Sequence, residues 1–511
     1  RKYRHALYIT NVSKEKPEKT TELNYQFLTT VSIQGDEFRP ADLPDGWDHS
    51  PEEDPRNWLT KQTELAYYSF CADESFRQNY FLEKLERVSW WERHQGKDQI
   101  LAAVLKKNPR FINEPVYAKR LEDEADKIVE QYAVGRLIVE GDNRYLSGDL
   151  LDFLNRLPVA KTGTSKKANT FIDFRWVQTL NHQNFFAPGA AYEPGHVCTL
   201  LRNPHIARNE EMQLYPIKER GYLYDQYLGH LTDVVMVGYS SLAAERLGGA
   251  DYDGDMIKTI SDSLLNDCVK RNIHHDPPRP RSIFSRSHNL PLLMIPTAQP
   301  QIRSADDWEA RFETVRSTFS SRVGQICNAA LDRSIIAYNE NSDAAERERC
   351  REETETLAIL TGLEIDSAKS GIRPDLDEYL THKTVKRSDF LKYKTLAEAV
   401  ETRRAWYEPT HAAKVKAFFK RVDWDEVDSN VERLPYLAQQ LKKNTPRIKA
   451  RPARDEELFS FAAQHPDWRE QLDSDKLAAV DALLRDYDAC LSRIRACRVP
   501  LKEKKRKSDV E

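Results

Sequence analysis

Ten residues in the middle of the chain constrain its fold more than any other segment. Residues 248–257 read Gly-Gly-Ala-Asp-Tyr-Asp-Gly-Asp-Met-Ile, so three carboxylates fall within five positions. Carboxylates this close repel one another unless a cation lies among them. Asp251 and Asp253 lie on one side of an extended segment, and Gly254 permits a bend that brings Asp255 toward the same point. The pattern predicts a hard-oxygen site suited to Mg²⁺, which keeps open positions for water and phosphate.

The flanking sequence helps to choose between the possible interpretations of this loop. Apolar, strand-like residues precede it at 234–239 and follow it at 256–260, which indicates a loop held by a rigid sheet and not a solvated acidic turn. A calcium loop of the D-x-D-x-D-G type is a poor match, because Met256 occupies its sixth position and Asp262 its twelfth, where glutamate is expected. A catalytic metal site is therefore favoured. In polymerases, such a site uses two ions, one for the attacking hydroxyl and one for the leaving pyrophosphate.

The rest of the chain predicts a mixed α+β fold. Apolar residues follow helical spacing from about residue 57 to 134. Residues 137–146 are typical of a hairpin that turns at Gly141-Asp-Asn, and Ser147 or Asp149 could cap a helix over 150–157. Further short strands are expected at 3–12, 170–176, 196–202, 212–217, 233–239 and 256–260. Apolar residues from Trp308 to Ala330 recur at steps of three and four, which predicts a helix that, if unbroken to Tyr338, is about 45–50 Å long.

These elements divide the chain into four expected regions. They are a strand with a mostly helical, neck-like region at 1–135, a catalytic barrel region at 136–276, a long-helix region at 277–400, and a helical C-terminal region with a charged tail at 401–511.

Composition restricts the class of protein. Charged residues make up 31% of the chain, the net charge is −4, and no apolar run approaches the roughly 18 residues that a membrane span needs. The seven cysteines form no CxxC pair, which favours reduced, buried thiols over a cysteine metal site. We therefore expect a soluble, cytoplasmic protein. Arg1 stands where an initiator methionine is expected, which suggests a fragment or a processed product.

Four segments together resemble a known family. They are Gly249-Ala-Asp-Tyr-Asp-Gly-Asp-Met, Leu201-Arg-Asn-Pro204, Val323-Gly-Gln-Ile-Cys-Asn-Ala-Ala-Leu and Ile365-Asp-Ser-Ala-Lys-Ser-Gly371. In order and distance they are similar to segments of the cell-encoded RNA-dependent RNA polymerases of RNA silencing and their phage and bacterial relatives. The aspartate loop also resembles that of the largest subunit of multisubunit RNA polymerases. The resemblance covers about residues 140–375.

The resemblance implies a fold and roles for individual residues. It implies a double-psi β-barrel that carries Asp251, Asp253 and Asp255 as catalytic metal ligands, and it places Arg202 at the ribose of the incoming nucleotide. The alternative for Arg202 is a salt bridge at the edge of the barrel.

Residues on the following helices receive weaker assignments from the same resemblance. Lys369 and Asp366 line the nucleic-acid channel in one interpretation and form an ordinary helix-end pair in the other. Gly324 and Asn328 are expected to serve close helix packing, and Gly254 is expected to be structural as well.

The function implied is template-directed RNA synthesis from ribonucleoside triphosphates by a two-Mg²⁺ mechanism, with a nucleic-acid template and the nascent RNA as partners. Silencing enzymes copy RNA and phage relatives transcribe DNA, so the template stays open. A catalytically incomplete nucleic-acid-binding fragment and a metal-dependent nuclease are the alternatives from other classes.

The family also uses a second barrel, upstream of the first, which supplies basic residues. The 511 residues hold no counterpart to it, and Lys161, Lys166 and Lys167 do not replace it. We therefore expect the chain to be nearly inactive alone, and to need an upstream segment or a partner chain.

Overall fold

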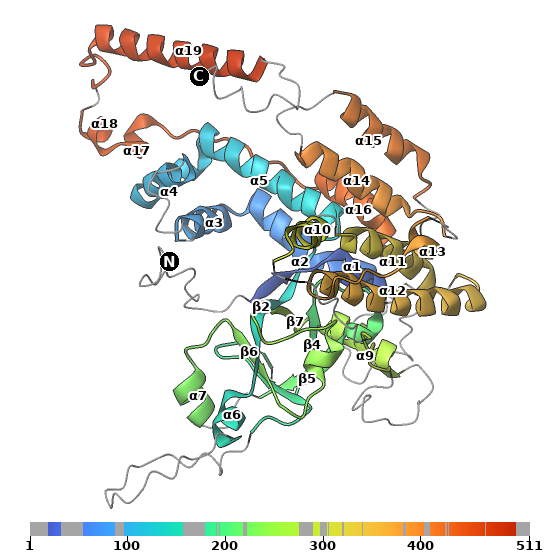
Figure 1. The fold of residues 1–511 in the computed structure, drawn as a ribbon. Coiled ribbons are helices and arrows are strands. Elements are labelled where there is room, and N and C mark those ends of the chain that lie inside the picture. The colour runs from blue at the N-terminus through green and yellow to red at the C-terminus, as the bar shows by residue number, and fades with distance from the viewer. Residues whose placement is uncertain are drawn as a thin grey trace, which may run out of the picture. The chain divides into compact units, whose positions relative to one another are not determined.

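The structure is a computed structural model with a mixed α+β fold (Figure 1). It describes residues 19–31, 55–86, 97–156, 179–217, 222–274, 290–296, 304–402 and 409–496, apart from positions 191, 194, 305, 319–320, 340, 382–384, 425–426, 428 and 466. The strands expected at 3–12 and 170–176 lie outside the described residues, as do Lys161, Lys166 and Lys167.

The chain forms two compact units. The first contains residues 1–66, 129–394 and 419–441, and the second contains residues 67–128, 395–418 and 442–511. All residues singled out from the sequence as site residues fall in the first unit.

A β-barrel lies at the centre of the first unit. The strands of its sheet are β1 (Thr20–Glu22), β2 (Ile138–Gly148), β3 (Asn184–Phe186), β4 (Cys198–Arg202), β5 (Met212–Pro216), β6 (Val234–Val237) and β7 (Met256–Ile260). Six of them close in the order β2-β6-β3-β5-β4-β7, because β2 pairs with both β6 and β7, while β1 pairs only with β2. Two parallel pairs, β2–β6 and β3–β5, mix with four antiparallel pairs.

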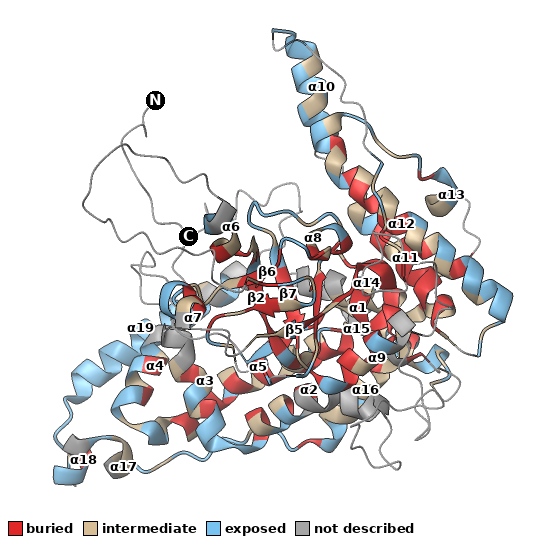
Figure 2. Ribbon diagram, turned by 90° about the horizontal axis from the view of Figure 1, so that it is seen from below, coloured by how far each residue is buried: buried red, intermediate tan, exposed pale blue. Residues whose placement is uncertain are grey.

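The expected fold class is confirmed. The closed barrel carries the aspartate loop, its mixed pairing agrees with the double-psi type, and helices flank it (Figure 1). One apolar cluster lies in it, in which Leu200, Leu214, Val235, Val237 and Ile257 are all buried. Figure 2 shows the strands mostly in the colour of buried residues.

The hairpin expected at 137–146 is wrong. These residues form the single strand β2, which passes from β1 to β7 at Gly141 without reversing. A Cβ on Gly141 would lie 2.2 Å from the carbonyl oxygen of Thr259, so the glycine serves a close approach of two strands and not a turn. Asp142, one of the residues that suggested a turn, is buried, and its Oδ2 lies 2.6 Å from Nε of the buried Arg144.

The helices of the first unit surround this barrel. The helices whose residues all belong to the first unit are α1 (Tyr25–Thr30), α6 (Leu150–Arg156), α7 (Tyr222–Leu228), α8 (Ala243–Arg246), α9 (Ser263–His274), α10 (Trp308–Thr318), α11 (Val323–Ala337), α12 (Ala344–Ser370) and α13 (Asp377–Leu380), with the short 3-10 helix η4 (Arg208–Glu210). The predicted cap of α6 is present, because Asp149 Oδ1 accepts from the backbone N–H of Leu151 at 3.0 Å and of Asp152 at 3.2 Å.

The single helix expected from Trp308 to Tyr338 is also wrong. The structure has two helices there, α10 and α11, and the backbone N–H of Arg322 between them donates to Glu364 Oε1 at 2.9 Å. Only the second half of the apolar stripe is buried, with Ile326 at 0% exposure. Trp308 and Phe312 remain 66% and 60% exposed, and Figure 2 shows α10 as largely exposed.

Helix α12 is the longest helix of the described residues, and its ends follow from its sequence. Asp343 caps it by accepting from the backbone N–H groups of Ala345 and Glu346 at 3.0 and 3.1 Å. Gly371 ends it in the left-handed conformation with a φ of 74°. Apolar residues of α11 and α12, such as Ile326 and Leu357, pack into one cluster with Ile206 and Ala207 of the barrel unit.

The second unit is helical. It contains α3 (Glu74–Glu86), α4 (Lys97–Lys107), the 3-10 helix η2 (Pro109–Asn113), α17 (Asp455–Leu458), α18 (Ser460–Gln464) and α19 (Ser474–Ala496). Some helices have residues in both units: α2 (Pro55–Ala72), α5 (Pro115–Ala133), α14 (Asp389–Thr402), α15 (Pro409–Arg421) and α16 (Asn430–Asn444). Phe81 and Tyr117 pack edge to face within the second unit, with their ring centroids 5.5 Å apart.

Two expectations from composition can be compared with the structure. Cys71, Cys198, Cys268, Cys327 and Cys350 are free and buried as expected, whereas Cys490 is partly exposed and Cys497 lies outside the described residues. Within the part of the chain that is described, no helix is long and apolar enough to cross a membrane.

Candidate metal and nucleotide site

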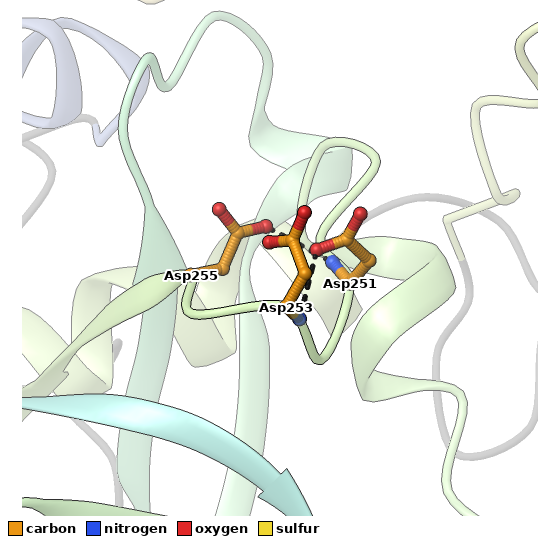
Figure 3. Close-up of side chains that lie close together, drawn as sticks. All are labelled: Asp251, Asp253 and Asp255. Atoms are coloured by element: carbon orange, nitrogen blue, oxygen red, sulfur yellow. Dashed lines mark hydrogen bonds between the residues drawn. The ribbon is translucent and has the colours of Figure 1, made fainter. Parts of the chain in front are cut away.

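The three aspartates converge on the loop between α8 and β7 (Figure 3). One carboxylate oxygen from each of Asp251, Asp253 and Asp255 lies within 4.8 Å of the other two, a grouping that can hold a metal ion. Asp251 and Asp253 are exposed, and the side chain of Asp255 is 18% exposed. The end of the loop is fixed to the barrel, because the backbone N–H of Leu146 in β2 donates to the carbonyl oxygen of Asp255 at 2.9 Å.

Hydrogen bonds inside the loop hold the carboxylates together. The backbone N–H of Asp251 donates to Asp255 Oδ2 at 3.0 Å, and that of Asp253 donates to Asp251 Oδ1 at 3.2 Å (Figure 3). A hydrogen bond between the side chains of Asp251 and Asp253 lowers the pKa of Asp251 and raises that of Asp253, and the negative charge of Asp251 raises the latter further. The closeness of the two carboxylates therefore makes the ionised form of Asp253 less favourable.

Glycines shape both ends of this loop. Gly248 and Gly249 enter it with φ values of 61° and 72°, and Gly254 has a φ of 127° between Asp253 and Asp255. Side-chain-bearing residues rarely adopt such angles. A Cβ on Gly254 would meet nothing within 4 Å, so the backbone conformation, and not lack of space, calls for glycine there.

Arg202 lies at the end of β4, directly beside the triad. Its Nε is 2.9 Å from Asp255 Oδ2, its Nη2 donates to Asp255 Oδ1 at 3.1 Å, and its Nη1 donates to the carbonyl oxygen of Gly248 at 3.0 Å. The salt bridge considered for Arg202 as a structural role is thus present, and its partner is one of the three aspartates. The following Asn203–Pro204 peptide bond is cis.

Lys369 and Asp366 lie on the last two turns of α12. Lys369 Nζ is 3.7 Å from Asp366 Oδ1, and the two side chains are 75% and 48% exposed, so the helix-end pair is present. The positive charge of Lys369 also contributes to lowering the pKa of Asp251 and opposes the rise in the pKa of Asp253. The C-terminal end of α12 therefore faces the aspartate loop.

Gly324 on α11 does not show the close packing expected for it. It is exposed, and a Cβ there would meet nothing within 4 Å, so helix packing does not require this glycine. Asn328 is partly buried and lines a pocket of about 290 Å³ with Gln325, Asp332, Tyr379 and Arg387, and its packing role stays a prediction.

Two buried residues behind the loop were missed in the sequence. Glu210 Oε2 accepts from the backbone N–H groups of Ile206 and Ala207 at 2.7 and 2.9 Å, and a Cβ on Gly248 would lie 2.8 Å from Glu210 Oε1. Burial raises the pKa of Glu210 to about 7. Arg246 is 2% exposed and donates to the carbonyl oxygens of Asn209 and Leu290, both at 3.0 Å. Glu210 and Arg246 end the short helices η4 and α8, where charged residues are common, so no local sequence pattern identifies them as buried residues near the site.

The aspartate cluster fits a divalent cation. It offers three hard oxygen ligands, it is open to solvent on one side, and its two exposed carboxylates repel each other, which a cation would relieve. Among the described residues, no other group of three acidic, histidine or cysteine side chains meets the same criterion.

Comparisons with known proteins agree with the motifs. Residues 175–415 match the family model described as RNA dependent RNA polymerase, which confirms the resemblance over this part of the chain. Among solved structures, the chain is similar to the RNA dependent RNA polymerase QDE-1 from Thielavia terrestris, with 12% sequence identity and a TM-score of 0.36 over 94% of this chain. The chain spans 48% of the length of that polymerase. No curated protein matches the chain.

Proposed function

We propose that this chain, whose residues 175–415 match the RNA-dependent RNA polymerase family, joins ribonucleotides on an RNA template, as the catalytic part of a polymerase. The observation that carries the proposal is the convergence of Asp251, Asp253 and Asp255 on one loop of a closed barrel, inside the matched segment. The barrel region at 136–276 is the proposed catalytic region.

Asp251, Asp253 and Asp255 would hold Mg²⁺. The bound ions would supply the chemistry of two-metal nucleotidyl transfer, in which the attacking 3′-hydroxyl and the leaving pyrophosphate both gain a cationic partner. The contribution of the protein is to fix the three carboxylates beforehand, which the backbone hydrogen bonds of Asp251 and Asp253 and the anchoring of Asp255 to β2 achieve.

Arg202 is the proposed reader of the incoming sugar. The ion pair with Asp255 and the bond to the carbonyl oxygen of Gly248 hold its guanidinium group beside the triad. A planar group with several donors, fixed at this position, can donate hydrogen bonds to ribose hydroxyls. The same contacts orient the loop, so Arg202 also acts as a positioning residue for Asp255.

Lys369, with Asp366 beside it, is proposed to face the nucleic acid. Its ammonium group is 75% exposed and lies close enough to the triad to influence the pKa of two of its members. Charge that develops on a transferred phosphate needs cations placed in advance. Lys369 supplies one from α12, and we propose that further cations come from the second barrel that the family resemblance implies.

An extension assay with labelled ribonucleotides tests the proposal, with RNA and DNA templates offered side by side. The chain is assayed alone and together with a segment that supplies the second barrel. Mg²⁺-dependent RNA product on the RNA template supports the proposal, and product on DNA alone would indicate a DNA-dependent enzyme. Degradation of the labelled RNA without extension would instead indicate a nuclease.

A further inference from the structure

A short apolar segment links the barrel to the helices beside the aspartate loop. Residues 290–295, here called the strap, read Leu-Pro-Leu-Leu-Met-Ile. The strap is anchored at its start, because the carbonyl oxygen of Leu290 accepts from Arg246 at 3.0 Å and that of Pro291 accepts from Asn209 at 3.2 Å. Leu293 packs against the apolar cluster shared by α11 and α12. These contacts at Leu290, Pro291 and Leu293 constrain where Ile295 lies.

Ile295 occupies a notch formed by two glycines. A Cβ built on Gly362, which is buried in the middle of α12, would lie 2.2 Å from Ile295 Cδ1 and 2.7 Å from Ile295 Cγ1. A Cβ on Gly249, at the entrance of the aspartate loop, would lie 3.3 Å from the same Cδ1 atom. The side chain therefore touches the backbone of α12 and of the loop at once, as only two residues without side chains permit.

The glycine of the notch on α12 is aligned along the helix with Lys369. Gly362 and Lys369 are seven residues apart, so they lie on nearly the same side of the helix, separated by two turns or about 10 Å. Gly249 precedes Asp251 by two residues. Ile295 thus holds the helix that carries Lys369 against the loop that carries the metal ligands.

We infer that Ile295 is a positioning residue that sets the distance between the aspartate loop and the Lys369 end of α12. The role of that distance in catalysis rests on the proposed function, whereas the contact itself does not. Interiors are packed closely enough that a displaced side chain moves its neighbours. A shift of about 1 Å in catalytic groups can cost on the order of a hundredfold in rate.

Three variants and a matched control test the inference. Gly362→Ala places a methyl group against Ile295, and rotation of Cδ1 alone does not clear it because Cγ1 is also too close. Ile295→Ala empties the notch without creating a clash. The double variant puts the new methyl into the space that the isoleucine leaves. Gly324→Ala is the control, because it also adds a methyl to a helix but into open space.

Two readouts separate the contact from the activity. Hydrogen exchange of the peptide at 248–256 is expected to rise roughly tenfold in each single variant, to recover in the double variant and to stay unchanged in Gly324→Ala. Exchange in β4 and β5 is expected to stay at the wild-type rate in all of them. Ribonucleotide extension, measured with the second-barrel segment present, is expected to fall about tenfold or more in the single variants and to recover partly in the double variant.

The outcomes are distinct. If Gly362→Ala and Ile295→Ala exchange at 248–256 like the control, the strap does not position the loop and the inference is overturned. The inference is also overturned if the double variant loses as much extension activity as the two single variants combined. If the wild-type chain shows no extension, the proposed function fails, while the exchange data still decide whether Ile295 holds the loop.

Discussion

Replacing Glu210 with glutamine should make the barrel more stable than in the wild type at alkaline pH, where Glu210 of the wild type is ionised. Glu210 lies behind the aspartate loop, where its carboxylate accepts from two backbone N–H groups and burial raises its pKa from 4.5 to about 7. Between these two values the folded chain keeps a proton that the unfolded chain has released. The unfolding free energy therefore falls as pH rises through this window. Glutamine keeps an acceptor oxygen for the same N–H groups and has no charge to bury.

The size of the effect follows from the pKa shift. One pKa unit corresponds to about 1.4 kcal/mol, so a shift from 4.5 to about 7 should cost the native state about 3 kcal/mol as pH rises from roughly 4.5 to 7. The stability of Glu210→Gln relative to wild type should rise by that amount over the same range. Groups that do not interact with Glu210 cancel in this difference. Glu211 does not cancel completely, because the charge of Glu210 contributes to raising its pKa to about 8, after burial as the main cause.

Hydrogen exchange of amides in β4 and β5, measured for both proteins at each pH, gives the free energy of opening around this residue. Glu364→Gln provides a control of opposite sign. Burial alone would raise the pKa of Glu364, but hydrogen bonds from Arg322 lower it below its usual value, so glutamine should destabilise the protein at neutral pH. If the difference in the free energy of opening between Glu210→Gln and wild type does not change with pH, ionisation of the buried Glu210 carboxylate does not destabilise the native state, and the reasoning is refuted.

Three further predictions concern the site. Asp253→Ala should lower ribonucleotide extension about a hundredfold or more, because it removes a metal ligand; activity within tenfold of wild type would remove Asp253 from the site. Arg202→Ala should weaken the preference for ribonucleotides over deoxyribonucleotides more than it weakens template binding, and unchanged sugar discrimination in a competition assay would leave only the ion pair with Asp255. Gly254→Ala and Gly195→Ala should each cost about 1–3 kcal/mol in thermal unfolding, since both glycines have positive φ and open space around them. Only Gly254→Ala should also impair extension, and equal extension by the two variants would contradict the importance of the bend.

The sequence predicted the aspartate cluster because its three members are local. Asp251, Asp253 and Asp255 lie within five residues, and the bend at Gly254 is a backbone property of glycine. Arg202 is about fifty residues away, and residue patterns alone did not place it beside Asp255; the family resemblance implied a role at the ribose of the incoming nucleotide and did not name Asp255 as its partner. The strands β4 to β7 were predicted within a few residues, because their apolar runs are bounded by glycine and proline.

The errors arose where tertiary contacts override local pattern. Gly141-Asp-Asn has the composition of a turn, but Tyr192 donates to Asp142 at 2.6 Å from fifty residues away and Arg144 pairs with it inside the barrel. The stripe from Trp308 onward has the spacing of one buried helix, yet only its second half has apolar neighbours in the core. The notch around Ile295 joins three distant segments, so nothing in their local sequence reveals it.

The claim that the three aspartates hold the ion at which ribonucleotides are joined is tested most directly by locating that ion. Fe²⁺ in place of Mg²⁺ reacts with added hydrogen peroxide to give Fe³⁺, hydroxide and hydroxyl radicals, and the radicals cut the polypeptide next to the bound metal. The predicted result is cleavage within residues 248–256 that Mg²⁺ suppresses and that disappears when all three aspartates are changed to asparagine. Cleavage elsewhere in a chain that still synthesises RNA, or cleavage that survives the triple change, would contradict the assignment.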